Sequence, residues 1–432
     1  MMAENDPLVA QERSRVELLK RAICLFTVAL LFSTWRLWIP QPTFPQVPLF
    51  QGLVDLPWWI DQILLSLLVP MLILVGIIRI SPRLTAVCLL LIVVLLTTLM
   101  VLNQHRIQPW AYLALLVLAT IACCTSHQIV IWLRALFISV YLFSALSKFD
   151  YLFLTTIGQQ LLSAGLELLG ISLSEWSERA RIGFALLLPA GELLTAVCLV
   201  FPRTRRLGVI MAICLHLTLM LILGPWGMQQ KTAVLIWNLQ FCILIPVVFW
   251  PFYNVSADAK VAEIQVTRRR FVASVGARLL LCLAICLPVV EGFGFWDSWV
   301  SWGLYSTRTA RVELYFQEDL AKRLPAELQP YLSEGTYQGY LKKFYIDRWS
   351  LAALNAPIYP SDRFGTGTVL ALLDQLQISD GVLMVHSSIP ARRTGSRKQD
   401  RIRAVDVMMR LPTVYRLNAK PRQGFLLSSD RQ

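Results

Sequence analysis

Charged residues are scarce in this sequence. Of its 432 residues only 16% are Asp, Glu, Lys or Arg, whereas 56% are hydrophobic. Soluble globular domains carry about a quarter charged residues, so this composition excludes an ordinary soluble protein and indicates one that lies in a lipid bilayer. The net charge of +13 would favour a nucleic-acid partner in a soluble chain. In a membrane protein it is explained by Lys and Arg kept at cytoplasmic helix ends, so we expect no nucleic acid.

Metal, redox and nucleotide motifs are missing as well. The nine cysteines all precede residue 287, and they form neither a C-x-x-C pair nor a zinc-type spacing. Most lie in apolar runs, where a small buried hydrophobic side chain is a simpler interpretation than a redox pair. The G-T-G at 365–367 lacks the lysine of a phosphate-binding loop. No internal repeat or matching pair of interrupted helices is present, which disfavours a secondary transporter.

Long apolar runs are what the sequence has instead. They predict nine membrane spans, at roughly 22–38, 62–78, 84–102, 110–126, 128–147, 182–201, 207–223, 232–250 and 272–293. The segment 151–170 is interrupted by Gly158, Gln159 and Gln160, so we expect it to be re-entrant or interfacial. Residues 1–21 are polar and the run after them shows no cleavage site, so we expect a retained signal anchor.

The distribution of basic residues predicts the orientation. With the N-terminus inside, the cytoplasmic segments contain Arg13, Arg15, Lys20, Arg21, Arg79, Arg83, the P-R-T-R-R turn at 202–206, Lys260 and Arg268 to Arg270, whereas the outer loop 39–61 has no Lys or Arg. The inverse orientation breaks the positive-inside rule. We therefore expect an all-α polytopic membrane bundle of about nine transmembrane helices over 22–300, with a cytoplasmic segment at 1–21. A small α+β extracytoplasmic domain follows over 301–432, and a bacterial inner membrane is the expected location.

The C-terminal domain is polar enough to fold in water. Its pattern predicts strands at 311–316, 381–388 and 404–409 and helices near 317–332, 347–355 and 366–377. The run 391–404 holds six basic residues against one acid. It is either a solvated loop or a surface that contacts anionic headgroups or an acidic protein partner.

Arg36, Arg79 and Arg134 lie near the ends of predicted spans, where their side chains can reach the interface, but Glu192 and His216 lie deeper. Glu192 is about ten residues from the outer end of its span and His216 about seven from the outer end of the next. At roughly 1.5 Å of rise per residue they come to similar depth on adjacent antiparallel helices. We expect the two side chains to pair, either as a polar clasp between helices or as catalytic groups.

The stretch VYLFSALSKFD, residues 140–150, ends an apolar run with Lys148. Tyr141, Ser144 and Lys148 share one helix face, which we expect to open toward the outer mouth of the bundle. Lys148 is either a snorkelling anchor or, held against apolar walls, a base. Asp150 nearby favours the charged ammonium. The outer loop NQHRIQPW, residues 103–110, brings His105, Arg106 and Trp110 toward the same mouth, or is a polar turn before a helix that starts at Pro109.

VYLFSALSKFD resembles the lysine-bearing segment of the vitamin K-dependent gamma-carboxylases. Val140, Tyr141, Lys148 and Asp150 match it without gaps, and Lys148 falls on that family's base. The family also carries an acid, an arginine, a glycine and a histidine across two helices, and these are matched by Glu192, Arg205, Gly208 and His216, with Glu in place of Asp. The bacterial relatives, grouped as the HTTM family, have a loop similar to H-R-x-Q-P-W. The resemblance covers roughly residues 20–300.

The resemblance implies a chemistry. A reduced naphthoquinone meets oxygen, Lys148 deprotonates the quinol, and the strong base so formed abstracts a proton in a dry pocket. It implies catalytic roles for Lys148, His216 and Glu192. We expect substrate contacts from Tyr141, Ser144, His105, Arg106, Trp110 and Arg205.

The sequence also departs from the family, and two other functions remain open. The lysine that precedes the family's base is Ser147 here, and a domain of about 130 residues replaces the large luminal region, so carboxylation of glutamate does not follow from the resemblance. One alternative is a redox-associated bundle of the DoxX or methylamine-utilisation type, which predicts functional thiols. The other is a non-catalytic membrane anchor that presents the C-terminal domain to a partner.

Overall fold

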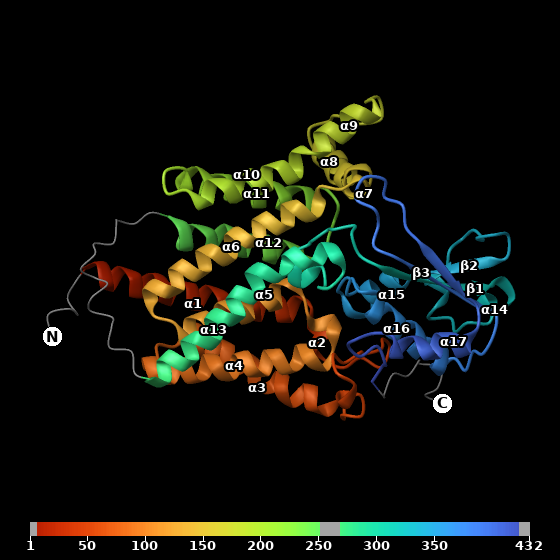
Figure 1. Cartoon of the computed structure of the whole chain (residues 1–432), viewed down its shortest axis with the longest axis horizontal. Coiled ribbons are helices and arrows are strands. Elements are labelled where there is room, and N and C mark those ends of the chain that lie inside the picture. Colours follow the sequence, from red (N-terminus) through yellow and green to blue (C-terminus); the bar gives the residue numbers. More distant parts are fainter. Residues whose placement is uncertain (1–6, 251–267, 423–432) are drawn as a thin grey trace.

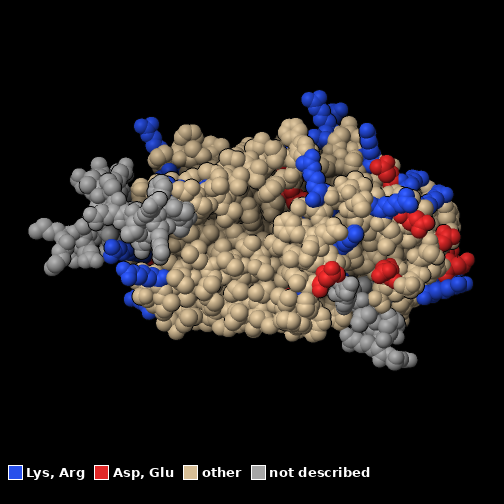
Figure 2. Space-filling view, turned by 60° about the horizontal axis from the view of Figure 1, so that its bottom comes forward, with Lys and Arg blue, Asp and Glu red and all other residues tan. Residues whose placement is uncertain are grey.

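The computed structural model describes residues 7–250 and 268–422. A bundle of long helices occupies one part of the molecule and a small domain with a β-sheet caps one end of it (Figure 1). The surface of the helical part is broad and almost uncharged, with Lys and Arg at its far end and mixed charges over the capping domain (Figure 2). Lys260, one of the basic residues used to predict orientation, lies outside the described residues.

The bundle is built from α1 (Pro7–Ser33), α3 (Trp59–Ile77), α4 (Pro82–Leu102), α5 (Pro109–Cys123), α6 (Ser126–Lys148), α10 (Leu187–Val200), α11 (Arg205–Leu223), α12 (Thr232–Phe249) and α13 (Arg268–Cys286). A short α2 (Trp35–Trp38) follows α1. Within the described residues, seven helical segments are long and apolar enough to cross a membrane: Trp59–Ile77, Pro82–Leu102, Ser126–Lys148, Glu178–Val200, Arg205–Leu223, Thr232–Phe249 and Ser274–Phe293. They indicate a multi-pass membrane protein.

Two of the nine predicted spans are not among these seven. The run predicted at 110–126 forms α5, which has 15 residues, and the run at 22–38 forms the end of α1 and then α2. α5 is largely enclosed within the bundle, with eleven of its 15 residues buried. It packs against α1, α4 and α13. A helix surrounded by other helices faces little lipid, so its length is set by protein contacts rather than by the bilayer.

The segment 151–170 forms two short helices, α7 (Tyr151–Thr155) and α8 (Ile157–Glu167), rather than one of spanning length. Thr156 separates them with φ −124° and ψ −91°. Gly158 lies where a Cβ would come within 2.9 Å of the Phe153 carbonyl oxygen. A third short helix, α9 (Glu178–Ala185), leads into α10. This part of the chain projects from the bundle beside α10 (Figure 1).

The hairpin of α10 and α11 brings two backbones into close contact. A Cβ at Gly208 would lie 2.9 Å from the backbone N of Leu199. A glycine is therefore needed for these helices to cross so closely. This crossing sets the depth of the side chains further along both helices, Glu192 and His216 among them.

The capping domain contains a four-stranded antiparallel sheet in the order β2-β1-β3-β4. Its strands are β1 (Arg311–Gln317), β2 (Leu341–Phe344), β3 (Val382–Ser387) and β4 (Gln399–Ile402), and its helices are α14 (Glu318–Lys322), α15 (Ile346–Leu354), α16 (Asp362–Gln375) and α17 (Val405–Arg410). Leu314 and Met384 are paired in the register and fully buried. α16 packs against β1.

Predictions for this domain are confirmed in part. The strands at 311–316 and 381–388 and the helices near 347–355 and 366–377 form as expected. The helix predicted over 317–332 is shorter, because Pro325 and Pro330 interrupt it. The strand predicted at 404–409 is wrong: these residues form α17, whose first turn contains Asp406. An acidic side chain there is favoured by the helix dipole.

Candidate active site

The end of α6 places an amine inside the protein. The helix starts with a capping box in which Thr125 and Gln128 satisfy each other's backbone N–H groups, and Lys148 is its last residue. The chain then turns, and the carboxylate of Asp150 accepts the N–H of Phe153 at 3.0 Å to start α7. The exposed fraction of Lys148 is only 4%. Its side chain therefore does not reach water as a snorkelling anchor would.

Lys148 forms a buried ion pair with Glu192. Its Nζ donates to Oε1 of Glu192 at 2.6 Å, to Oε2 at 2.7 Å and to Oγ of Ser144 at 2.8 Å. An ammonium has three N–H donors, and these three bonds use all of them. Glu192 is 9% exposed. The pair thus brings one positive and one negative charge into a largely apolar part of the bundle.

A second polar group lies on the neighbouring helices. Nδ1 of His216 lies 2.8 Å from Oδ1 of Asn238, and Nε2 of His216 lies 2.7 Å from the Tyr141 hydroxyl. The Asn238 amide nitrogen donates to the Val234 carbonyl oxygen at 2.8 Å, which leaves the amide oxygen facing the imidazole. His216 therefore carries its proton on Nδ1, and Nε2 accepts the Tyr141 hydroxyl proton.

The predicted pairing of Glu192 with His216 is wrong. Glu192 binds Lys148, and His216 binds Tyr141 and Asn238. On α6 their partners Lys148 and Tyr141 are seven residues apart. Asn238 is not among the residues predicted from the sequence, although an amide within an apolar span is itself a signal for a polar contact inside the bundle.

Both polar groups border one cavity of about 400 Å³. Tyr141, Ser144 and Lys148 all line it, as the shared helix face predicts. Its other walls are mainly apolar and come from α8, α10, α11 and α12, with aromatic side chains that include Trp110, Phe153, Trp237, Phe241 and Trp299. Leu351, Asn355, Pro357 and Pro360 of the capping domain complete the lining. The cavity is thus enclosed jointly by the bundle and the domain.

The remaining predicted site residues lie elsewhere, except for Trp110. His105 and Arg106 are fully buried in the seam between bundle and domain and do not line the cavity. Nε2 of His105 lies 2.8 Å from the carbonyl oxygen of Pro357. Burial lowers the pKa of His105 to about 4, so the ring is neutral at pH 7. Arg205 begins α11, about 15 Å along the helix from the first cavity-lining residue of that helix, and donates to the carbonyl oxygen of Leu199.

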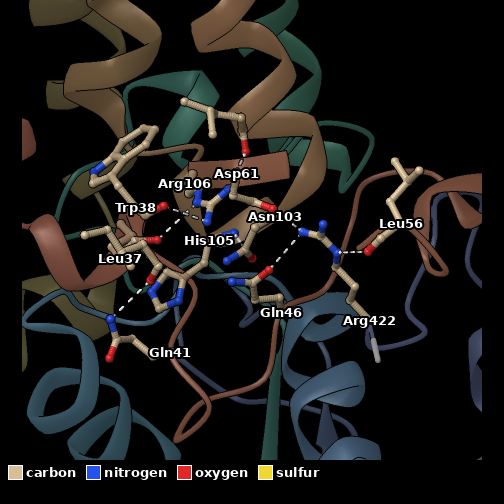
Figure 3. Close-up of polar contacts among 12 residues, drawn as sticks. Leu37, Trp38, Gln41, Gln46, Leu56, Asp61, Asn103, His105, Arg106 and Arg422 are labelled. Carbon is tan, nitrogen blue, oxygen red and sulfur yellow. Dashed lines mark hydrogen bonds and ion pairs between the residues drawn. The ribbon is translucent and has the colours of Figure 1, made fainter. Parts of the chain in front are cut away.

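Arg106 is part of a charge network at the interface between the bundle and the capping domain (Figure 3). Its guanidinium pairs with Asp61 and donates to the carbonyl oxygens of Leu37 and Trp38. From the other side, Arg422 donates to Oδ2 of Asp61 at 2.6 Å. One buried carboxylate thus joins α3, the 103–110 loop and the end of the capping domain. Asp61 gave no signal in the sequence beyond a single acid at the start of an apolar run.

Other chemistries find little support in the described part of the chain. All nine cysteines are free, and none lines the cavity. Within the described residues, no three His, Cys, Asp or Glu side chains gather closely enough to hold a metal ion. Comparison with models of protein families, with curated proteins and with solved structures finds no match for this chain.

Proposed function

We propose that this chain is a multi-pass membrane enzyme that binds a lipid-soluble compound with an acidic hydroxyl, such as a reduced naphthoquinone, and removes its hydroxyl proton. The observation that carries the proposal is the Lys148–Glu192 ion pair on the wall of an apolar cavity. Burying two charges is costly, and ionisable groups within a membrane bundle are therefore functional candidates. The similarity of VYLFSALSKFD to the base-bearing segment of the gamma-carboxylases and their HTTM relatives supports the same reading.

The cavity fits such a compound. Small-molecule sites have volumes of about 300–1,000 Å³ and mostly apolar walls with a few polar groups, and this cavity meets both conditions. Trp110, Trp237 and Phe241 offer faces on which a fused aromatic ring can stack. When bound, a reduced naphthoquinone supplies a hydroxyl proton and reducing equivalents for oxygen.

Lys148 and Glu192 act as one proton-accepting unit. As an ammonium, Lys148 has no lone pair on its nitrogen and cannot accept a proton, and its three N–H groups are bound to Glu192 and Ser144. Passing one proton to Glu192 leaves an amine, whose Nζ then accepts the hydroxyl proton. The ammonium so restored faces the new anion, and the apolar walls strengthen that attraction and keep water away. His216 and Tyr141 form a separate pair that orients the other end of the substrate.

We further propose nine spans, with the N-terminus in the cytoplasm and the capping domain outside a bacterial inner membrane. In this topology α1 and α5 are the first and fourth spans. Arg134 lies within electrostatic range of Arg15 and Arg205, and α1, α6 and α11 begin at the end of the bundle away from the capping domain (Figure 1). A basic end there agrees with the positive-inside rule.

A non-catalytic anchor that only presents the capping domain to a partner is less consistent with the contacts between the bundle and the domain. The domain supplies part of the cavity wall and is tied to the bundle through Asp61, His105 and Gln104. A displayed domain needs fewer buried contacts with its anchor.

The test is oxygen uptake by the full chain in lipid nanodiscs supplied with a reduced naphthoquinone, with the product checked for epoxide. We expect uptake to fall at least a hundredfold in Lys148→Ala and Glu192→Ala, since a positioned base contributes about 10²–10⁴-fold. Trp226→Ala, at an exposed loop position, is the control and should keep full uptake. Equal uptake in Lys148→Ala, or none above buffer in the wild type, contradicts the proposal.

A further inference from the structure

The loop between β3 and β4, residues 388–398, lies against the ends of two membrane helices. The N–H of Tyr151, three residues beyond α6, donates to the carbonyl oxygen of Arg392 at 2.9 Å. Gly395 has φ +69°, and a Cβ there would lie 2.7 Å from the Leu152 side chain. In Figure 1 this loop rises from the sheet to α7. The contact holds the loop where α6 leaves the bundle.

The other side of the loop touches the end of the last candidate span. A Cβ at Gly294 would lie 3.2 Å from Cδ1 of Ile389. Gly294 directly follows the segment Ser274–Phe293. The loop therefore bridges the points at which two apolar helices end, which is where a membrane interface is expected.

Exposed aromatic side chains flank this region. Tyr151 is 41% exposed, Phe293 75% and Phe295 64%. Large aromatic side chains exposed just beyond the ends of apolar helices are typical of the membrane interface. Between them the loop carries its basic residues.

Arg397 is not part of the exposed charge. It donates to the carbonyl oxygens of Thr309, Ser388 and Thr307 at 2.6–2.8 Å, and so holds the loop in shape. Arg392 and Arg393 are exposed. Neither has an ion pair with any other residue in 7–250 or 268–422. The loop is thus rigidly placed while two of its guanidinium groups remain available.

Arg308 adds a third, deeper guanidinium beside them. It is 8% exposed and donates from one terminal nitrogen to the carbonyl oxygen of Gly292 at 3.3 Å. Its Nε–H is buried and has no hydrogen-bond partner within the described residues. Burial and then the neighbouring Arg392 cation lower the pKa of Arg308. A buried cation with an unused donor is costly unless a further acceptor binds it.

The nearby acids do not balance these three charges. Glu291 and Asp150 are the carboxylates within electrostatic range. The Asp150 carboxylate already accepts bonds from the Phe153 N–H and the Thr307 hydroxyl. Arg308 and Arg392 thus share these two carboxylates, one of which is engaged elsewhere, and Arg393 adds a further exposed charge directly after Arg392 in the sequence.

We propose that Arg308, Arg392 and Arg393, here called the arginine patch, bind the phosphate of an anionic phospholipid headgroup. Guanidinium groups bind phosphate oxygens through paired N–H donors, which ammonium groups do less well. The patch lies between aromatic side chains at the ends of two spans, so the phosphate comes from a lipid whose chains lie beside them. The headgroup would stabilise the contact of the β3–β4 loop with α7.

The test compares lipid retention by the full chain. Protein is reconstituted in nanodiscs of equal phosphatidylcholine and phosphatidylglycerol, released into detergent, and its bound lipids are counted by native mass spectrometry. We expect the wild type to retain several-fold more phosphatidylglycerol than phosphatidylcholine, and Arg392→Gln/Arg393→Gln to lose this preference. Both changes are at exposed positions, so folding is expected to persist, and circular dichroism checks it.

The matched control removes two charges at the far end of the domain. Lys322→Gln/Arg323→Gln changes exposed residues at the end of α14, remote from the bundle (Figure 1), and should keep the wild-type preference. No preference in the wild type, or an unchanged preference in Arg392→Gln/Arg393→Gln, overturns the proposal. Displacement of the lipid by millimolar inorganic phosphate would assign the patch to a free anion and overturn it too.

Discussion

Lys148 and Glu192 are 44 residues apart in the sequence, yet the Lys148 amine lies 2.6 and 2.7 Å from the two carboxylate oxygens. Both side chains are largely buried, and both face the same cavity. The pair links α6 to α10 on the wall of the cavity. The pair therefore affects both the stability of the bundle and the proposed proton transfer, and substitutions can separate these two effects.

Breaking the ion pair should destabilise the bundle more than removing it entirely. Lys148→Ala or Glu192→Ala leaves one buried charge without its partner, which costs about 3–5 kcal/mol. The double variant Lys148→Met/Glu192→Leu replaces the pair with apolar side chains and should recover most of that loss, while oxygen uptake stays abolished. Thermal unfolding in nanodiscs measures the difference. Equal stability of the single and double variants would show that the two charges do not interact.

Asn238 should determine which nitrogen of His216 carries the proton. The chain has four histidines, so ¹⁵N resonances of labelled imidazoles can be assigned by substitution. We expect the Nδ1–H form of His216 in the wild type and a mixture of both forms in Asn238→Leu. Gln240→Leu is the matched control on α12, because Gln240 is also a buried amide but its nitrogen has no partner among the described residues. An unchanged spectrum in Asn238→Leu would contradict the assignment.

The pair of His386 and Asp362 should make the capping domain sensitive to pH. Nε2 of His386 lies 2.8 Å from Oδ2 of Asp362, and this bond raises the pKa of His386 while it lowers that of Asp362. The folded state holds the histidine proton more tightly, so its stabilisation is complete below the unfolded pKa of about 6.5. It is lost as the pH rises above 6.5 through the raised folded pKa.

The carboxyl group acts in the opposite direction. Asp362 contributes stability above its unfolded pKa of about 3.9, and this is lost as the pH falls through the depressed folded pKa. Unfolding followed from pH 3 to 9 should thus show a stability maximum between the two titrations. His386→Gln should remove the alkaline decline and also reduce the acid decline, because Asp362 loses the partner that lowers its pKa. A decline of the same size in His386→Gln would assign it to another group.

Asp61 should be essential for joining the domain to the bundle. Asp61→Asn leaves the guanidinium groups of Arg106 and Arg422 buried without a counter-charge (Figure 3). We expect a loss of about 3–5 kcal/mol and faster cleavage near residue 418 by added protease. Glu313→Gln, which breaks the partly exposed pair with Lys343, should cost less than about 1 kcal/mol. Protease resistance equal to the wild type in Asp61→Asn would contradict this role.

Sequence patterns predicted the features that depend on local periodicity. The shared face of Tyr141, Ser144 and Lys148 follows from helical spacing alone, and all three line the cavity. Residue spacing does not determine how one helix is rotated relative to the next. For that reason the sequence predicts a pair of Glu192 with His216, whereas Glu192 binds Lys148.

Long-range pairing accounts for the other misses. The strands β2 and β4 have four residues each, too few to show an alternating pattern, and they form because β1 and β3 offer edges on which to pair. The loop residues His105 and Arg106 were expected at the cavity, but the capping domain covers them. Their positions depend on Asp61, Pro357 and Arg422, residues distant in the sequence.

The most direct test of the central claim is the absorption spectrum of a bound naphthol, which carries the hydroxyl of a reduced naphthoquinone but does not enter the oxygen reaction. Full-chain protein in nanodiscs is titrated at a pH at which the free naphthol is neutral. The account predicts a naphtholate band in the wild type that is absent in Lys148→Ala and Glu192→Gln. A spectrum of neutral naphthol in the wild type, or an equal naphtholate band in all three proteins, would contradict proton transfer to the Lys148–Glu192 pair.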